Sequence, residues 1–459
     1  MKTDRRTFLK SAGILSGAAI SLPTLADEVN LAPKFNMTGY AAPKIDTVKV
    51  AIIGLGMRGP GAVDRLSYIE GVDIVALCDK QKDRAEKAQG ILDKKNMPKA
   101  KIYSGENGWK TMLKDEELDL VYICTPWEYH AEMSIEAMKA GAHAASEVPI
   151  AMTVKDCWEV VKVSESTKKH CMMLENCCYD FFEMLTLNMT RQGLFGELIH
   201  AEGAYIHDLL DLNFNKNGYA DMWRLKENAT KNGNLYPTHG LGPIAQCLNV
   251  NRGDVMTHMV SMASDDFMMG KKAKELAATD SFFQEFAGEN YRGNMNTSVI
   301  KTNKGKTMMI QHDVTSPRPY SRLHALSGTK GFAQKYPKEG IAFGHSFVSE
   351  DELKDLYDKY TPELVKFIGE QAKKVGGHGG MDFMMDWRLI DCLRNGLPLD
   401  QDVYDAASWS VIFPLSLESV KKNSKTVRIP DFTKGAWKSN KPHDMSLDGG
   451  GTTEIKKKV

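Results

Sequence analysis

A tyrosine and a histidine three residues apart, Tyr236 and His239, offer two side chains that could exchange protons with a substrate. Histidine suits this role because its unperturbed pKa lies near neutrality. Pro237 between them is typical of the first turn of a helix, where residues three apart lie on the same side. We therefore predict His239 as an acid or base and Tyr236 as its hydrogen-bonding partner. The alternative is a histidine at a helix start that is bonded only to the backbone.

A glycine-rich motif occurs much earlier, at residues 54–59 (GLGMRG), between an apolar segment and a helix-like segment. Glycines in this setting permit a tight turn and let the backbone approach a pyrophosphate at a helix N-terminus. Asp79 ends the next apolar segment about 25 residues later, near the usual spacing for an acid that binds ribose. Because a carboxylate repels a 2′-phosphate, we predict NAD over NADP. The nearby cations Arg58, Lys80 and Lys82 weaken that preference.

Two further stretches follow later apolar segments and should reach the same crevice. In residues 124–130 (CTPWEYH) a proline ends a strand, so the residues from Trp127 to His130 are expected on the nicotinamide side. For His130 alone, helix capping is an equally good interpretation. In residues 146–149 (SEVP) a glutamate leads into an inert valine, and Asn176 ends the next segment. The carboxyl ends of parallel strands meet at one edge of the sheet, where ligands bind.

The order of segments predicts the fold. Strand-like and helix-like segments alternate over residues 48–176, which is typical of a doubly wound parallel α/β sheet, a Rossmann domain. After this, segments such as 198–209 (LIHAEGAYIHDL) alternate with period two, which indicates an open antiparallel sheet with Tyr205 and His207 on one face. A helical tail follows. We therefore predict a second, α+β substrate-binding domain over residues 177–459 with a mainly antiparallel sheet.

The N-terminus predicts export. Residues 1–26 contain two arginines, an apolar run and small residues before a cleavage site, the pattern of a twin-arginine signal peptide. The run is too short and too interrupted to span a bilayer, and no later stretch does better. Residues 27–47 are rich in proline, alanine and asparagine and are interpreted as a tether. We expect a periplasmic protein without a membrane span.

Composition excludes several partners. The chain has 59 basic and 59 acidic residues and a net charge of 0, so it offers no single-sign field for nucleic acid or an anionic membrane. A neutral small molecule is the expected partner. The eight cysteines show no C-x-x-C spacing and no Cys/His cluster, and the histidines show no H-E-x-x-H pattern. We therefore predict buried, reduced thiols and no metal site.

Several motifs of this sequence resemble those of a known protein superfamily. The glycine turn, C-T-P with a downstream histidine, and E-x-P resemble the glucose–fructose oxidoreductase/inositol dehydrogenase superfamily, in which E-x-P is commonly E-K-P and the lysine helps move a proton; here that position is Val148. A narrower resemblance, over nearly the whole chain, is to the NAD-dependent α-N-acetylgalactosaminidases of glycoside hydrolase family 109. It is carried by IGLGMRGPGAVDRL, IEGVDIVALCD, SEVP, MWRLKENATKNGNLYPTHGLGP and the twin arginines.

The motifs and the resemblance together imply two sets of site residues. The cofactor contacts are Gly54, Gly56, Met57, Arg58, Gly59, Asp79, Trp127, Glu128, Tyr129, His130, Glu147, Val148 and Asn176. The sugar contacts are Tyr205, Arg224, Tyr236, Pro237, Thr238, His239 and Tyr320. Among these, Tyr205, Tyr236 and His239 are expected to carry catalysis, so no lysine is needed after the glutamate of SEVP.

The resemblance implies an exo-acting glycosidase that releases terminal α-linked N-acetylgalactosamine. NAD⁺ would take a hydride from C3, and a base would remove the acidified C2 proton. The C1 substituent would then leave by elimination. Water would add in its place, and the reduced cofactor would return the hydride. A tightly bound NAD regenerated in each cycle suits an exported enzyme, because the periplasm offers no obvious NAD pool. No metal is required. An exposed sheet face of the second domain predicts a homodimer.

Two other functions stay open from the sequence. One is an exported NAD(P)-dependent sugar oxidoreductase with a tightly bound cofactor, which would accumulate an oxidised product; Val148 counts against its lysine-assisted form. The other is a non-catalytic sugar-binding protein that keeps NAD as a structural element. Cleavage of an aryl glycoside without net reduction of NAD would favour the glycosidase over both.

Overall fold

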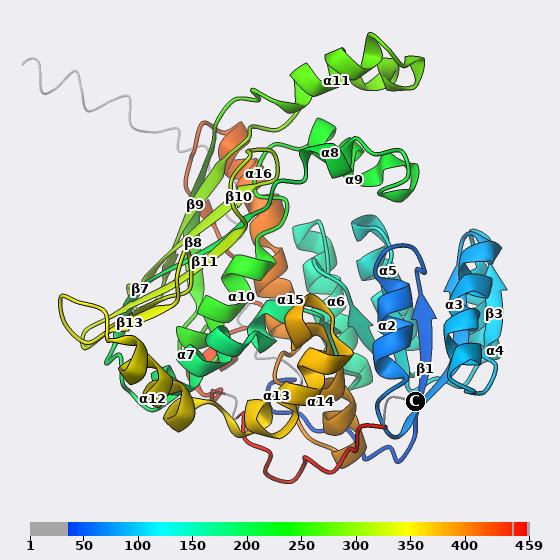
Figure 1. Cartoon of the computed structure of the whole chain (residues 1–459), viewed down its shortest axis with the longest axis horizontal. Coiled ribbons are helices and arrows are strands. Elements are labelled where there is room, and N and C mark those ends of the chain that lie inside the picture. The colour runs from blue at the N-terminus through cyan, green and yellow to red at the C-terminus, as the bar shows by residue number, and fades with distance from the viewer. Residues whose placement is uncertain (1–34, 443–444, 457–459) are drawn as a thin grey trace, which may run out of the picture.

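The computed structural model of the chain describes residues 35–442 and 445–456 (Figure 1). The predicted signal peptide, residues 1–26, and the start of the predicted tether lie outside these described residues. Within the described ranges, no helix has both the length and the apolar character needed to cross a membrane.

The prediction of a tether is wrong for residues 35–47. Met37 is buried, and its backbone N–H donates to the Tyr404 hydroxyl. Ala41 pairs with Pro398 in an isolated β-bridge. This segment therefore packs against the C-terminal part of the chain. Its lack of periodicity reflects an irregular path along a surface.

A six-stranded parallel sheet forms the N-terminal part, which confirms the predicted Rossmann fold. The strand order is β3-β2-β1-β4-β5-β6. The strands are β1 Val48–Ile53, β2 Val72–Asp79, β3 Lys101–Ser104, β4 Leu120–Ile123, β5 His143–Ser146 and β6 Cys171–Met173. The helices between them are α2 Gly59–Leu66, α3 Lys82–Lys94, α4 Gly108–Asp115, α5 Trp127–Lys139 and α6 Val154–Thr167.

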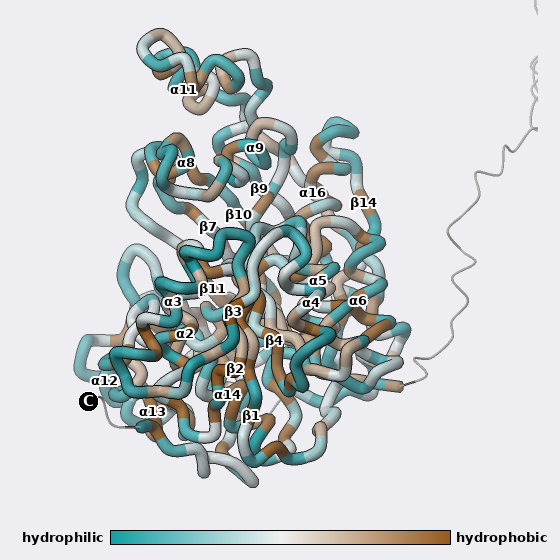
Figure 2. Tube along the Cα trace, turned by 90° about the vertical axis from the view of Figure 1, so that its right-hand side faces the viewer, coloured by the Kyte–Doolittle hydropathy of each residue, from teal (hydrophilic) through white to brown (hydrophobic). Residues whose placement is uncertain are grey.

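The central strands β1 and β4 are apolar because helices cover both faces of the sheet. Every residue of β4 is buried, and Lys49 is the one exposed residue of β1. Figure 2 shows hydrophobic residues along β1, β2 and β4. The strand order reverses between β1 and β4, and in such sheets ligands bind beyond the carboxyl ends of the strands at that point. The topology therefore places a site beyond Ile53 and Ile123.

An eight-stranded, mainly antiparallel sheet forms the second part, as predicted. Its order is β13-β12-β11-β7-β10-β9-β8-β14, with β7 and β10 parallel to each other. The strands are β7 Leu198–Ile206, β8 Met256–Ala263, β9 Asn296–Thr302, β10 Thr307–Asp313, β11 Ser321–Gly328, β12 Phe332–Gln334, β13 Gly340–Ala342 and β14 Val427–Arg428.

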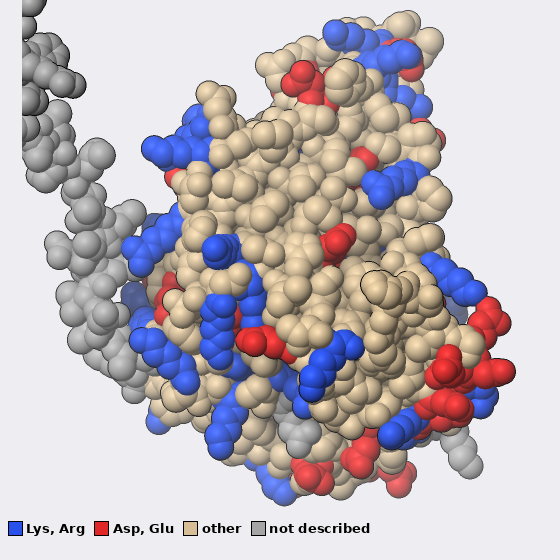
Figure 3. Space-filling model, turned by 90° about the vertical axis from the view of Figure 1, so that its left-hand side faces the viewer, with Lys and Arg blue, Asp and Glu red and all other residues tan. Residues whose placement is uncertain are grey.

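The two faces of this sheet differ. The helices α10, Thr238–Cys247, and α16, Ile412–Lys421, pack against one face. Met262 and Val299 are exposed on the other face, and Figure 3 shows a broad area of uncharged side chains there. The homodimer predicted from an exposed sheet face stays a prediction.

The remaining helices lie in the second part or return from it to the Rossmann part. Those of the second part are α7 Phe181–Arg191, α8 Leu210–Asn213, α9 Trp223–Thr230, α11 Met269–Ala277, α12 Glu350–Tyr360 and α13 Glu363–Val375. Two later helices, α14 Met381–Asn395 and α15 Val403–Ser410, return to the Rossmann part and pack against α2 and α6 (Figure 1). Short 3₁₀ turns are η2 Asn176–Tyr179, η3 Ala220–Met222, η4 Ser281–Phe286, η5 His378–Gly380 and η6 Ala436–Lys438.

Buried histidines make the fold sensitive to acid. Burial lowers the pKa of His170 and of His324 to about 4, below the value of roughly 6.5 expected when the chain is unfolded. The unfolded chain therefore binds protons that the folded protein does not, and stability falls as pH drops from about 6.5 towards 4. We expect each histidine to lower the free energy of unfolding by about 2 kcal/mol between roughly pH 7 and pH 5.

Urea unfolding followed by circular dichroism at the two pH values checks this prediction. The substitution His170→Gln should reduce the pH dependence, whereas His345→Gln at an exposed position should leave it unchanged. Equal pH dependence in all three proteins would contradict the assignment.

Candidate active site

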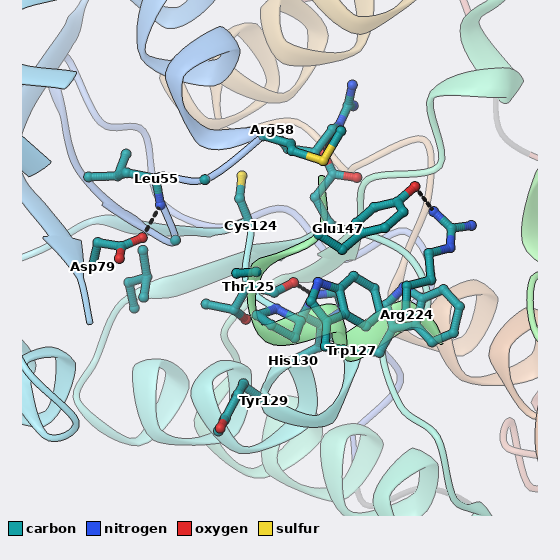
Figure 4. Close-up of a pocket in the computed structure, with 18 of the residues that line it drawn as sticks. Leu55, Arg58, Asp79, Cys124, Thr125, Trp127, Tyr129, His130, Glu147 and Arg224 are labelled. Carbon is teal, nitrogen blue, oxygen red and sulfur yellow. Dashed lines mark hydrogen bonds and ion pairs between the residues drawn. The ribbon is translucent and has the colours of Figure 1, made fainter. Parts of the chain in front are cut away.

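A cavity of about 970 Å³ lies beyond the carboxyl ends of the Rossmann strands, where the second part faces them. The glycine motif, Asp79 and residues 124–130 line one end, and Tyr205, Arg224 and Tyr236 line the other. Figure 4 shows side chains from both ends converging on the same space. Most residues of the two predicted sets are therefore brought together in one cavity; Gly59, Pro237, Thr238 and Tyr320 do not line it.

The glycine turn leaves room for a dinucleotide backbone. Gly54 has a φ of +89°, and a Cβ there would lie 2.7 Å from the backbone of Cys124. A Cβ on Gly59 would lie 2.1 Å from the Gly54 carbonyl oxygen, so the helix start can approach the strand only without a side chain. A Cβ on Gly56 would meet only Arg84, at 3.7 Å, and would occupy the open side of the turn. This cradle fits the pyrophosphate of NAD.

Asp79 lies at the predicted place and is nearly buried. Its carboxylate accepts hydrogen bonds from Leu55 N–H at 2.7 Å and Gln81 N–H at 2.8 Å (Figure 4). These bonds tie the end of β2 to the glycine turn and hold the carboxylate at the cavity wall. The geometry suits a ribose hydroxyl, and the predicted contact stays a prediction.

Arg58 connects the glycine turn to two other elements. Its Nε donates to Glu147 at 2.8 Å, and its Nη1 donates to Asp382 of α14 at 3.2 Å. Asp382 is fully buried and also accepts from Asn176 and His378. Two arginines and His378 hold the pKa of the Asp382 carboxyl far below its ordinary value, against the opposing effect of burial. Two predicted cofactor residues, Arg58 and Asn176, thus converge on an aspartate that sequence reasoning missed.

In the segment 127–130, His130 supports neighbouring loops, whereas Trp127 packs against an aromatic ring of the cavity. His130 is fully buried, and its ring nitrogens lie 2.7 Å from the carbonyl oxygens of Pro149 and Thr125. His130 therefore supports the two loops, which favours its structural interpretation. Trp127 is buried and stacks on Tyr236 with ring centroids 5.6 Å apart. Of the other cofactor candidates, those that line the cavity are Met57, Glu128, Tyr129 and Val148.

His239 has a different partner from the predicted one. Its Nδ1 lies 2.6 Å from Glu175 Oε1, whereas the Tyr236 ring meets it edge-on at 4.8 Å between centroids. The prediction of a Tyr236–His239 hydrogen bond is therefore corrected, because the packing of η2 against α10 brings Glu175 to the ring. Burial favours the neutral form of Glu175, but the pull of His239 outweighs it, and the net pKa of this carboxyl lies below its ordinary value.

The same packing creates a cluster that sequence spacing did not reveal. Ligand-type atoms of Glu175, Cys177 and His239 all lie within 4.8 Å of one another. The cysteines and histidines are not clustered along the sequence, but the fold brings Cys177 and His239 together, so the prediction of no Cys/His cluster is corrected. Burial raises the pKa of the Cys177 thiol well above its ordinary value, so it stays protonated. A cation would have to displace the His239–Glu175 hydrogen bond, and the prediction of no metal stays a prediction.

The other predicted sugar contacts, Pro237, Thr238 and Tyr320, do not line the cavity. Tyr320 is 37% exposed, and its ring meets His207 edge-on at 4.9 Å. Pro237 precedes α10 as its N-cap, and Thr238 is fully buried at the first turn. Pro237 and Thr238 therefore position His239 from behind, while Tyr320 stands near the rim.

Two histidines beyond the predicted sets also line the cavity. His207 Nδ1 shares a hydrogen bond of 2.9 Å with the Tyr205 hydroxyl. His378 lies in the glycine-rich residues 376–380 and has a side chain that is 54% exposed; its Nδ1 lies 2.9 Å from Asp382 Oδ2 and 3.2 Å from Arg58 Nη1. Strand alternation pointed to His207. For His378 the only sequence signal was a single imidazole flanked by glycines.

Comparison with known families divides the chain at the same place as the fold. The family described as "Oxidoreductase family, NAD-binding Rossmann fold" matches residues 48–175. The family described as "Glycosyl hydrolase 109, C-terminal domain" matches residues 179–439. The chain belongs to glycosyl hydrolase family 109. Membership of this family, predicted from the motifs, is confirmed.

Relatives of family 109 match over most of the chain. Glycosyl hydrolase family 109 protein 5 of Phocaeicola vulgatus is 47% identical over 428 residues, which cover 88% of this chain and 81% of the relative. The family 109 protein of Porphyromonas gingivalis is 49% identical and covers 86% of both chains. That of a Shewanella species is 45% identical and covers 95% of this chain and 98% of the relative.

Solved structures share the fold of this family 109 chain. Myo-inositol dehydrogenase from Lactobacillus casei, in complex with NAD(H) and myo-inositol, has a TM-score of 0.56 and 17% identity, and the match covers 84% of this chain and 99% of that chain. A levoglucosan dehydrogenase in complex with NADH and L-sorbose has a TM-score of 0.62 and 16% identity, covering 84% and 100%. At such identities the likeness establishes the fold alone.

A close contact between two glycines sets the position of His239 in this family 109 protein. A Cβ on Gly240 would lie 2.3 Å from the backbone of Ala204, and one on Gly203 would lie 2.2 Å from the Gly240 carbonyl oxygen. We expect Gly240→Ala to push α10 from β7, to lower stability by about 1–3 kcal/mol, and to displace the adjacent His239. Urea unfolding and glycosidase assays measure both effects.

The matched control is Gly90→Ala, at a helical glycine with no atom within 4 Å of the added Cβ. It should leave activity unchanged and stability unchanged or higher. A Gly240→Ala protein as stable and as active as Gly90→Ala would contradict the proposed contact.

Proposed function

We propose that this protein is an exo-acting glycosidase that releases terminal α-linked N-acetylgalactosamine by a redox-neutral, NAD-dependent oxidation, elimination, addition and reduction. The main support is a single cavity that joins a dinucleotide cradle to side chains able to exchange protons, in a chain of family 109. When bound, NAD supplies the reversible removal and return of a hydride. The protein must supply acids and bases for every other step.

In this proposal His239 accepts the proton of the sugar hydroxyl that is oxidised. The hydrogen bond from Nδ1 to Glu175 fixes the ring and leaves Nε2 for the cavity. A buried carboxylate in this position also stabilises the imidazolium that forms. Tyr205 and Tyr236 flank the ring, at 5.4 and 4.8 Å between centroids. Because the Tyr205 hydroxyl shares a hydrogen bond with His207 Nδ1, Tyr205 can act as the C2 base if its own hydroxyl proton moves to that imidazole as the C2 proton arrives.

In the same proposal His378 exchanges a proton with the leaving group. Its imidazole lies at the edge of the cavity and is half-exposed, so it can contact both an aglycone and water. Its Nδ1 lies against buried Asp382, and Nε2 has no hydrogen-bond partner within the described part of the chain. Elimination needs an acid at the departing oxygen and addition needs a base for water. One imidazole at this edge can serve both steps.

Tight retention of NAD and export to the periplasm belong to the same proposal. The residues that line this end of the cavity come from both parts of the chain: Arg58 and Glu147 lie in the Rossmann part, and His378 lies just before α14. A cofactor enclosed in this way can be loaded before export by the twin-arginine route. Regeneration in each cycle then removes the need for an external NAD supply.

The test uses purified, dialysed protein and a panel of aryl α- and β-glycosides without added NAD. We expect cleavage of the α-N-acetylgalactosaminide, NAD released on denaturation, and deuterium at C2 of the product formed in D₂O. Cleavage only during stoichiometric consumption of external NAD⁺ would contradict the redox-neutral cycle. Net accumulation of reduced cofactor with free sugar and no cleavage would indicate a sugar oxidoreductase.

A further inference from the structure

Most buried arginines among the described residues pair with a carboxylate, but one at the active site does not. Six arginines are buried among the described residues. Four of them have a carboxylate partner: Arg65 with Asp386 at 2.7 Å, Arg252 with Asp405 at 2.6 Å, Arg322 with Glu183 at 2.8 Å and Arg388 with Asp400 at 2.9 Å. Arg224 and Arg292 have no carboxylate within ion-pair distance among the residues described.

Of these two, Arg224 lines the cavity. Its Nη1 donates to the Tyr219 hydroxyl at 2.8 Å, while its buried Nη2 has no hydrogen-bond partner among the described residues. The guanidinium lies 5.2 Å from the ring of Trp127 and 4.9 Å from the ring of Tyr236 (Figure 4). Aromatic faces attract a cation but do not cancel its charge. The sugar end of the cavity therefore carries an uncompensated positive charge.

Groups behind the cavity strengthen this positive field. Arg292 is buried and does not line the cavity, and its Nη2 donates to the His312 carbonyl oxygen at 3.1 Å. Burial, with help from both arginines, lowers the pKa of His312 well below its ordinary value. Burial and Arg224 likewise lower the pKa of His207. A desolvated charge without a partner is costly to the fold, so Arg224 is suited to meet a negative charge on a ligand.

We infer that Arg224 stabilises the negatively charged oxygen that forms on the sugar when its C2 proton is removed. This inference rests on the proposed function and specifies one of its steps. With C3 oxidised to a ketone, the C2–H bond breaks and its electron pair forms a C2=C3 double bond, while the carbonyl pair moves to O3. The proton goes to a protein base. The C1–O bond then breaks as the O3 charge returns, and the leaving oxygen takes a proton from a protein acid.

A preorganised cation in a desolvated site acts most strongly on charge that develops during the reaction. Arg224 meets this condition because aromatic rings surround it and hold it before substrate binds. A permanent anionic substituent on the sugar would present the same chemistry to the guanidinium. The experiment separates the two sources.

The test compares the full-length protein with Arg224→Met and Arg224→Lys, using 4-nitrophenyl α-N-acetylgalactosaminide and its 6-O-sulfated analogue. Retained NAD and thermal unfolding establish that each variant is folded and loaded. In Arg224→Met we expect release of 4-nitrophenol and deuterium exchange at C2 to fall by about 100- to 1,000-fold. Absorbance of reduced nicotinamide after mixing should not fall, because hydride removal precedes the anion. Arg224→Lys should recover part of the loss by keeping the charge.

Several results would overturn the inference. If Arg224→Met raises only KM and leaves kcat and C2 exchange intact, Arg224 is a ground-state contact. If the wild-type protein prefers the sulfated glycoside and Arg224→Met removes only that preference, the partner is a permanent anion. If the wild-type protein neither reduces its NAD nor cleaves either glycoside, the proposed function fails first and the inference fails with it.

Discussion

Replacing His239 with asparagine is expected to lower kcat/KM for an aryl α-N-acetylgalactosaminide by about 10³-fold, within the range typical of a lost general acid or base. The reason is that the imidazole lines the cavity between Tyr205 and Tyr236 and is held by Glu175 at 2.6 Å. Asparagine can keep a hydrogen bond to that carboxylate but cannot take up a proton. Initial rates and the absorbance of reduced nicotinamide after mixing measure the loss, which should already affect the oxidation step.

The matched variant is Glu175→Gln, which keeps the shape of the side chain and removes its charge. Because the imidazolium would lose its carboxylate partner, reduced nicotinamide should form more slowly after mixing. A merely structural role for Glu175 would lower stability without slowing this step. If His239→Asn reduces cleavage less than tenfold, His239 is not the acid or base and the proposed mechanism needs another group.

Replacing His378 with asparagine is expected to have a comparable effect that depends on the leaving group. For a glycoside with a poor, alkyl leaving group we expect a loss of about 10²- to 10⁴-fold, because departure then requires protonation. For 4-nitrophenol, which leaves as a stable anion, the loss should be at least tenfold smaller. His378 lines the cavity and, among the residues that the structure describes, its Nε2 has no hydrogen-bond partner, so it meets the requirement for this acid.

Reduced nicotinamide should still form in the His378→Asn protein, since hydride removal from C3 does not involve the leaving group. This readout separates His378 from His239, whose replacement should suppress that signal. A uniform loss over all leaving groups would assign His378 a positioning role. The substitution His258→Asn, at an exposed strand position outside the cavity, is the control and should leave all rates unchanged.

The cofactor half of the site could be predicted because its parts are local in the sequence. The turn at residues 54–59 needs only a strand before it and a helix after it, and Asp79 ends the next strand. Parallel topology then sends every strand end to the same edge, whatever the side chains contact. Apolar runs of the length of β1 and β4 establish that topology without knowledge of their neighbours.

The proton-handling half could not be completed in this way. Spacing in a helix suggested Tyr236 for His239, because a neighbour three residues away is the closest partner that a sequence reveals. The actual partner, Glu175, lies 64 residues earlier in a 3₁₀ turn. His378 was recognisable only as an imidazole among glycines, and its place at the cavity depends on α14 returning to the Rossmann part.

The sequence by itself thus determined a Rossmann part, a second part with a mainly antiparallel sheet, membership of family 109 and the identity of most residues around the cavity. Only the tertiary structure decided which of those residues are paired. In the folded protein, one carboxylate lies next to His239 and two carboxylates lie next to Arg58. Among the described residues, no carboxylate pairs with Arg224. The physical reason is that strand and helix patterns depend on near neighbours in the chain. Charge compensation and hydrogen bonding depend instead on groups within a few ångströms in space, which only the packing of distant elements brings together.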